Sequence, residues 1–217
     1  MAAFDLEEQE QISQIKGWWE QYGKLVTTVA VLAALASVGW QGWNWYEGRQ
    51  TLEASALYDR LQKAAVERNA GQAREAAGKL IDGYGATPYA GLAALLSAKV
   101  QVEAGDLKNA RVPLAWAAEK ARDPALRSLA RLRLATVMFD EKAYDEALAQ
   151  LQAPPEEGFE ARFADLKGDI LAAQGKREEA RAAYKSAVAA LEKATKAEAL
   201  TLRELAQAKL DAVGGAQ

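Results

Sequence analysis

The chain has 217 residues, half of them hydrophobic, and contains no cysteine and no histidine. Disulfide bonds, thiolate nucleophiles, histidine-containing catalytic triads and histidine metal sites are therefore excluded. Residues 1–24 carry five acidic and two basic side chains, whereas residues 25–217 carry 25 of each sign. Because nucleic-acid-binding proteins need a basic excess to neutralise phosphates, this balance argues against a nucleic-acid partner.

The N-terminal part contains an apolar run that is long enough to cross a lipid bilayer. From Leu25 to Tyr46, 22 residues pass without an Asp, Glu, Lys or Arg. As a helix such a run spans about 33 Å, against ~30 Å for a hydrocarbon core. Aromatic side chains favour the headgroup level, and they bracket the run on both sides. We predict a transmembrane helix with these interface residues: Trp18, Trp19, Tyr22, Trp40, Trp43, Trp45 and Tyr46.

Two other interpretations of the run explain fewer of its features. A cleaved signal peptide has a basic start and a small-residue cleavage site. Here the N-terminus is acidic, with Asp5, Glu7 and Glu8, and the run ends in Trp and Tyr. A buried helix of a soluble core accommodates the alanines but not the two aromatic clusters. Flanking charge leaves the orientation open, because a long C-terminal domain translocates largely regardless of it.

The rest of the chain has the composition and spacing of a helical repeat protein. It is rich in Ala, Leu, Glu, Lys and Arg, which are good helix formers, and β-branched residues are sparse after position 50. Gly71, Gly105 and Gly175 are each followed five residues later by alanine, and the first two lie 34 residues apart. That is the length of a tetratricopeptide repeat. A further copy has Lys142 at the turn position, so four copies predict an α-solenoid.

Several positions predict how the repeats pack and end. Small residues at Gly168 and Ala180 let two antiparallel helices approach, and Tyr184 is expected to fill the volume between neighbouring pairs. Pro113 lies in the second helix of the second repeat, where a proline is expected to kink the helix or shift its start. The stretch from Thr195 to Val213 is expected to form a capping helix.

The predicted fold is therefore all-α, with one N-terminal transmembrane helix followed by a tetratricopeptide-repeat-like α-solenoid. The predicted segments are an N-terminal stretch at 1–24, the transmembrane helix at 25–46, the helical repeats at 47–194, and a capping helix with its tail at 195–217.

A solenoid presents one long concave face, which the first helix of each pair lines. Counting from the small residue of each second helix predicts a partner-binding groove with these members: Leu92, Leu95, Lys99, Val102, Leu129, Leu132, Thr136, Phe139, Arg162, Asp165 and Asp169. Leu95 and Leu132 are equally compatible with a place in the core, because helices bury their apolar faces. Phe139 is expected to contact the partner. The mixture of apolar and charged side chains suits a peptide or an unfolded segment better than a small ligand.

Patterns that would indicate an enzyme are incomplete. Gly83-Tyr84-Gly85 lacks the third glycine of a dinucleotide fingerprint, and the Gly-Lys pairs at 78–79 and 175–176 lack the following Ser or Thr of a phosphate loop. Asp165 and Asp169 lie four residues apart but have no base or metal ligand beside them in the sequence. We expect no catalytic residues, no metal site and no cofactor.

Short motifs along the chain also match a known family in their order and spacing. They are Ile15-Lys16-Gly17-Trp18-Trp19 with Gly23, then Gly39-Trp40 with Trp43, then Ala54-Ser55-Ala56-Leu57-Tyr58, then Tyr89-Ala90 with Ala93-Ala94-Leu95, then Leu129-Ala130-Arg131-Leu132-Arg133-Leu134-Ala135, and Leu166-Lys167-Gly168-Asp169-Ile170. In these motifs the chain resembles the YfgM family, the tetratricopeptide-type ancillary subunit of the bacterial Sec translocon.

The resemblance implies a function, a location and partners. The location is the inner membrane, crossed once, with the N-terminus in the cytoplasm and the repeats in the periplasm. The implied partners are the SecYEG translocon, a membrane-anchored periplasmic chaperone and unfolded secretory proteins, which the chain would help to pass to chaperones. The alternative is a scaffold for outer-membrane or envelope assembly. Such scaffolds are typically attached through a lipidated cysteine, and this chain has no cysteine.

Overall fold

The computed structural model describes residues 3–192 and 197–214, and within these ranges every regular element is an α-helix. The helices are α1 (Ala3–Val66), α2 (Ala70–Tyr84), α3 (Pro88–Glu103), α4 (Leu107–Lys120), α5 (Pro124–Asp140), α6 (Tyr144–Gln150), α7 (Glu160–Ala173), α8 (Arg177–Ala190) and α9 (Ala197–Gly214). The prediction of an all-α chain is confirmed. The chain divides into two compact units, Met1–Arg49 and Gln50–Gln217.

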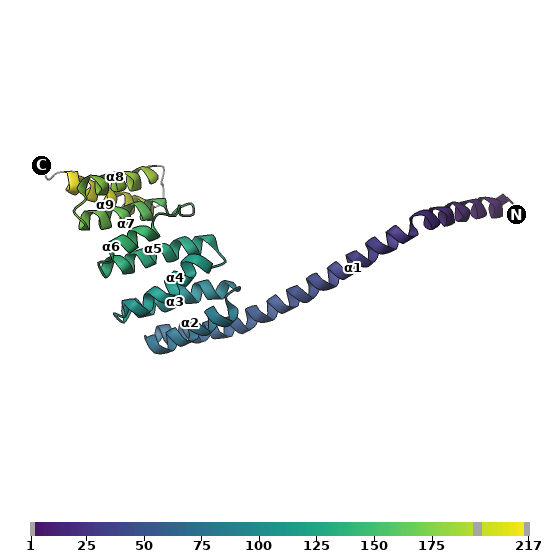
Figure 1. Cartoon of the computed structure of the whole chain (residues 1–217), viewed down its shortest axis with the longest axis horizontal. Coiled ribbons are helices and arrows are strands. Elements are labelled where there is room, and N and C mark those ends of the chain that lie inside the picture. The colour runs from purple at the N-terminus through teal and green to yellow at the C-terminus, as the bar shows by residue number, and fades with distance from the viewer. Residues whose placement is uncertain (1–2, 193–196, 215–217) are drawn as a thin grey trace. The chain divides into compact units, whose positions relative to one another are not determined.

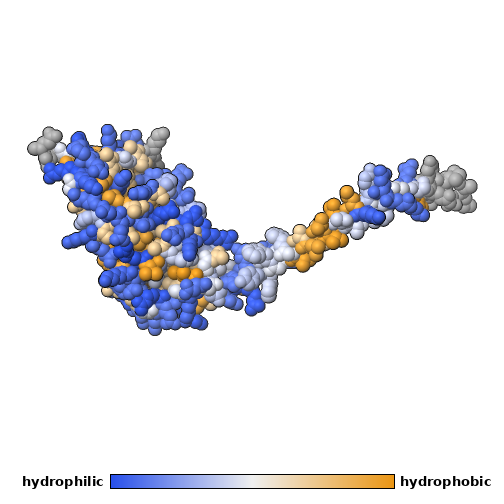
Figure 2. All heavy atoms as spheres, viewed as in Figure 1, coloured by the Kyte–Doolittle hydropathy of each residue, from blue (hydrophilic) through white to orange (hydrophobic). Residues whose placement is uncertain are grey.

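The first unit consists of the part of α1 that precedes Gln50. Within the described residues, α1 is the one helix that is long and apolar enough to cross a membrane, and none of its apolar window is buried. Figure 2 shows this window as a hydrophobic band along the helix. The hydroxyls of Thr27 and Thr28 donate to the carbonyls of Gly23 and Lys24 at 2.7 and 2.8 Å, so the helix itself satisfies them.

Aromatic rings gather at both ends of the apolar run. The ring of Trp18 lies 6.4 Å from that of Trp19 and 5.9 Å from that of Tyr22, and Trp43 lies 6.5 Å from Tyr46. In a helix, the 18 residue-to-residue steps from Tyr22 to Trp40 cover about 27 Å. That separation suits two interfaces either side of a ~30 Å hydrocarbon core.

The second unit is a stack of antiparallel helix pairs, as Figure 1 shows for α2 to α9. The pairs are 50–66 of α1 with α2, which share a buried cluster, then α3 with α4, α5 with α6, and α7 with α8, and α9 packs on α8. Successive pairs also contact each other, because α3 packs on α2, α5 on α4 and α7 on α6. The second unit therefore has the arrangement that the repeat pattern predicts.

The same turn closes the first helix of every pair. Its central residue has a positive φ, and the four such residues are Arg68, Gly105, Lys142 and Gly175, with φ of 53°, 77°, 63° and 76°. The residue after each one donates its backbone N–H to the carbonyl five residues earlier, over 2.8–2.9 Å: Asn69 to Ala64, Asp106 to Gln101, Ala143 to Met138 and Lys176 to Leu171. This is the Schellman helix ending, in which a left-handed residue satisfies carbonyls at the helix end.

The turn positions correct the repeat register predicted for the first pair. Gly71 is not the turn residue; Arg68, three residues earlier, adopts the left-handed conformation. The small residue five positions on is therefore the fully buried Ala73, not Ala76. Glycine is favoured at this turn but not obligatory, so glycine spacing alone misplaces the repeat. The prediction that Lys142 replaces the turn glycine is confirmed.

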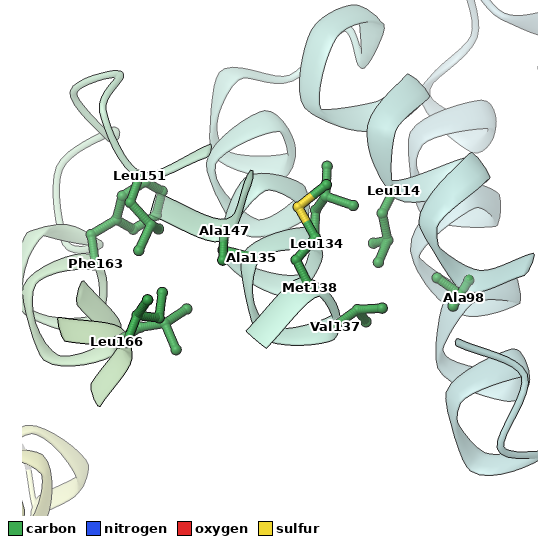
Figure 3. Close-up of a cluster of buried hydrophobic side chains, with 12 residues drawn as sticks. Ala98, Leu114, Leu134, Ala135, Val137, Met138, Ala147, Leu151, Phe163 and Leu166 are labelled. Carbon is green, nitrogen blue, oxygen red and sulfur yellow. The ribbon is translucent and has the colours of Figure 1, made fainter. Parts of the chain in front are cut away.

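Alanine-rich interfaces and a few large side chains make up the core. The largest cluster joins α3 to α7, and Figure 3 shows Leu114, Leu134 and Met138 between the flanking helices. Pro113 is buried inside α4, which begins at Leu107, so the proline does not displace the helix start. The predicted start of the capping helix at Thr195 lies outside the described residues, and α9 is described from Ala197.

Candidate partner-binding site

A cavity of about 470 Å³ opens between α3 and α5, the first helices of the second and third pairs. Its lining residues are Tyr58, Leu92, Leu95, Leu96, Ala98, Lys99, Val102, Glu103, Leu114, Leu129, Arg133, Thr136, Val137 and Asp140. Most are aliphatic, and Leu92 and Val102 are 38% and 39% exposed although neither is polar. Sites that enclose a small ligand or a few side chains measure roughly 300–1,000 Å³.

The structure brings six of the predicted groove residues together in this cavity. They are Leu92, Leu95, Lys99, Val102, Leu129 and Thr136. Two others, Leu132 and Phe139, are partly buried and pack against the main core cluster. The ring of Phe139 lies 5.9 Å from that of Tyr144, at the start of α6. Phe139 is therefore held by its own repeat and does not line the cavity.

Four of the remaining cavity residues lie at positions that the repeat relates to one another. The turn residues Gly105 and Lys142 are 37 positions apart, and the same offset pairs Leu96 with Arg133 and Glu103 with Asp140. The predicted groove residues on α3 and α5 already follow this offset, as Leu92 with Leu129 and Lys99 with Thr136 show. The prediction did not extend it to the charged positions Glu103, Arg133 and Asp140.

The three predicted residues of the fourth repeat lie on α7, away from the cavity. Arg162 is exposed. Asp165 and Asp169 each accept a hydrogen bond from Lys209 of α9, over 2.8 Å in both cases, and Asp169 also accepts one from the Tyr184 hydroxyl at 2.8 Å. These carboxylates therefore tie α9 to α7, which the sequence pattern did not predict.

Burial and charge act in opposite directions on the pKa values of Asp165 and Lys209. Burial is the largest influence on the Asp165 carboxyl and raises its pKa, although Lys209 partly offsets it. Burial lowers the pKa of Lys209, but its bonds to the two carboxylates outweigh that effect, so the pKa lies above its ordinary value. Burial and the bond to Asp169 raise the pKa of Tyr184. At neutral pH Lys209 is therefore charged and Tyr184 protonated.

The chemistry of the cavity is that of a binding surface. Within the described ranges, no group of three or more Asp or Glu side chains is arranged to hold a metal ion. The lining has aliphatic walls and four charged residues, Lys99, Glu103, Arg133 and Asp140. Such a surface can bury an apolar segment and orient it with a few polar contacts.

Comparison with known proteins places the whole chain in one family. A family model described as a tetratricopeptide repeat-like domain matches residues 16–215. The ancillary SecYEG translocon subunit of Neisseria gonorrhoeae is 32% identical over 97% of this chain and 99% of its own length. The chain belongs to the YfgM family. The proteins of the same name from Haemophilus influenzae and Escherichia coli are 33% and 29% identical, over 85% and 83% of this chain and 90% and 87% of their own lengths.

YfgM membership covers both units of the chain. The family model begins at residue 16, before the apolar run, and ends at residue 215, after α9. The aromatic-bracketed helix and the helical repeats are thus parts of one family architecture. In this chain, the α3–α5 cavity is a candidate site on the repeat portion of that architecture.

Proposed function

We propose that this YfgM-family chain is a membrane-tethered interaction module that associates with the SecYEG translocon and helps pass secreted proteins to periplasmic chaperones. The observation that carries the proposal is the open apolar cavity between α3 and α5, in a chain whose relatives are named ancillary SecYEG translocon subunits. A helical solenoid offers extended surfaces that hold partners, and an aliphatic cavity suits unfolded polypeptide.

The proposed anchor is α1, which crosses the inner membrane once through residues 25–46. Its support is the charge-free run with exposed side chains and a tryptophan cluster at either end. We place residues 1–24 in the cytoplasm and residues 47–217 in the periplasm, on the family resemblance, since flanking charge does not decide the orientation. Protease added to spheroplasts should digest the repeats and spare a tag on the N-terminus. Protection of the repeats in intact spheroplasts would reverse this orientation.

Site-specific photocrosslinking in living cells tests the proposed partners. A photoreactive amino acid replaces Leu92 at the cavity, and in a matched strain it replaces Val112, a 69% exposed residue of α4 that does not line the cavity. We expect crosslinks from position 92 to translocon subunits, a membrane-anchored periplasmic chaperone or secretory proteins, and far fewer from position 112. Crosslinks from position 92 to outer-membrane assembly proteins alone would favour the scaffold function and overturn the proposal.

A further inference from the structure

The charged side chains around the α3–α5 cavity are unequally paired. The Nζ of Lys99 lies 3.7 Å from a carboxylate oxygen of Glu103. In the part of the chain that the structure describes, Arg133 and Asp140 have no ion-pair partner. Arg133 is one helical turn from both Leu129 and Val137, so it projects from within the apolar wall. The cavity therefore combines an apolar surface with an unpaired cation, Arg133, and an unpaired anion, Asp140, which lies seven residues farther along α5.

Oppositely charged side chains meet between α7 and α9. Helix α9 packs on α8 as α5 packs on α4, and Lys209 of α9 reaches α7. Between α7 and α9, Lys209 meets both Asp165 and Asp169 at 2.8 Å. There the carboxylates of Asp165 and Asp169 neutralise the charge of Lys209. Between α3 and α5 the molecule supplies neither a counter-ion for Arg133 nor a side chain that fills the cavity.

We infer that the α3–α5 cavity binds a short polypeptide segment in which an aliphatic or aromatic anchor is followed directly by an acidic residue. This inference rests on the proposed function and adds the chemistry of the bound segment. The anchor lies between Leu92 and Leu129, and the carboxylate pairs with Arg133. Asp140 is about 10 Å farther along α5, seven residues at 1.5 Å each, which is too far to favour a basic residue beside the anchor.

Defined peptides test this selectivity directly. The full-length chain in lipid nanodiscs is titrated with fluorescein-labelled peptides that share a Gly-Ser host and carry Leu-Phe-Glu, Leu-Phe-Lys or Ser-Ser-Glu at the centre. We expect Leu-Phe-Glu to bind most tightly, and Ser-Ser-Glu to bind about tenfold or more weakly than that, since it lacks the anchors. Leu-Phe-Lys should bind roughly three- to tenfold more weakly, because the pair with Arg133 is solvent-exposed.

Variants locate the binding to the cavity. Leu92→Ser should weaken Leu-Phe-Glu binding about tenfold or more, whereas Val112→Ser, outside the cavity, should leave it unchanged. Arg133→Glu should invert the preference, so that Leu-Phe-Lys binds better than Leu-Phe-Glu. Far-UV circular dichroism verifies the fold of each variant, and Val102→Ser replaces Leu92→Ser if the latter loses helicity.

Each result separates this inference from the proposed function. Equal binding of the three peptides, or equal effects of Leu92→Ser and Val112→Ser, would overturn the inference and leave translocon crosslinks from position 92 standing. Selective peptide binding without translocon or chaperone crosslinks would overturn the proposed function alone.

Discussion

Tyr184 lies so close to Gly168 that no Cβ atom fits between them. A methyl group added to Gly168 would lie 2.9 Å from Cζ of the ring and nearer still to Cε1. The ring is 3% exposed, and its hydroxyl donates to Asp169 at 2.8 Å, so the ring has little freedom to retreat. The sequence-based expectation that Gly168 permits a close helix approach is confirmed in the α7–α8 pair, where the Tyr184 ring is the group that packs against it.

Gly168→Ala should therefore destabilise the repeats by about 1–3 kcal/mol, since overpacking forces the ring or the helices apart. Gly78→Ala is the matched control, because a Cβ at Gly78, inside α2, meets nothing within 4 Å. The control should be neutral or up to about 1 kcal/mol more stable, as alanine is the better helix former. Thermal unfolding of the full-length chain, followed by circular dichroism, measures both; equal melting temperatures would contradict the close approach.

Lys142→Gly should stabilise the third pair by about 1 kcal/mol. Lys142 has a φ of 63°, a conformation that costs an L-residue roughly 1–2 kcal/mol and glycine nearly nothing. The reverse change, Gly105→Ala at a φ of 77°, should destabilise by a similar amount. Urea unfolding of the two variants should give shifts of opposite sign, and a shift in the same direction would show that the turns are not equivalent.

The ion pairs of Lys209 with Asp165 and Asp169 should make the packing of α9 on the repeats weaker at alkaline pH. The folded-state pKa of Lys209 lies above its ordinary value, so its contribution to stability is fully present at neutral pH and is lost as pH rises through that raised pKa. Its side chain is 25% exposed and that of Asp165 is 13% exposed. We therefore expect Lys209→Met to cost about 1–3 kcal/mol at pH 7, less than a fully buried pair.

Lys209→Arg keeps its charge at high pH, so its stability should fall less steeply than that of the natural chain between about pH 10 and 12. Lys79→Met, which removes an exposed pair with Glu75, should leave the free energy of unfolding unchanged. Denaturant unfolding at several pH values tests this, and parallel pH curves for the natural chain and Lys209→Arg would contradict it.

Substitution of Phe139 distinguishes a role in packing from a role in partner binding. If Phe139 contacts a partner, Phe139→Ala should weaken partner capture with little change in melting temperature. Because the ring packs on the core cluster and on Tyr144, we expect instead a loss of about 2–4 kcal/mol. That corresponds to a fall of several degrees in melting temperature for a domain of this size. An unchanged melting temperature together with lost crosslinking would restore Phe139 to the binding surface.

The apolar helix should hold the full-length chain in the membrane. After alkaline carbonate extraction, the protein should remain in the pellet, with Met1 or Ala2 as its N-terminus. The physical reason is the charge-free run of 22 residues, whose transfer to water would expose a large apolar area. Recovery in the supernatant, or a new N-terminus after Trp40, would support cleavage of the run.

Local features of the sequence determined much of the fold. The charge-free run, the helix-forming composition and the left-handed turns at Gly105 and Gly175 depend on residues close together in the chain. Six residues of the cavity were predictable for the same reason, because helical spacing places them on one face of α3 or α5.

Tertiary structure decided the contacts between residues far apart in the chain. Lys209 reaches Asp165 across 44 residues, and nothing in the local pattern of either helix indicates that pair. Arg68 takes the turn position in place of Gly71, and the buried cluster that α1 shares with α2, with Ala64 and Ala73 among its members, fits a first helix that ends there. The sequence limits which helix faces are apolar. The angle and register between helices determine which of those faces pack together and which leave a cavity between them, as α3 and α5 do.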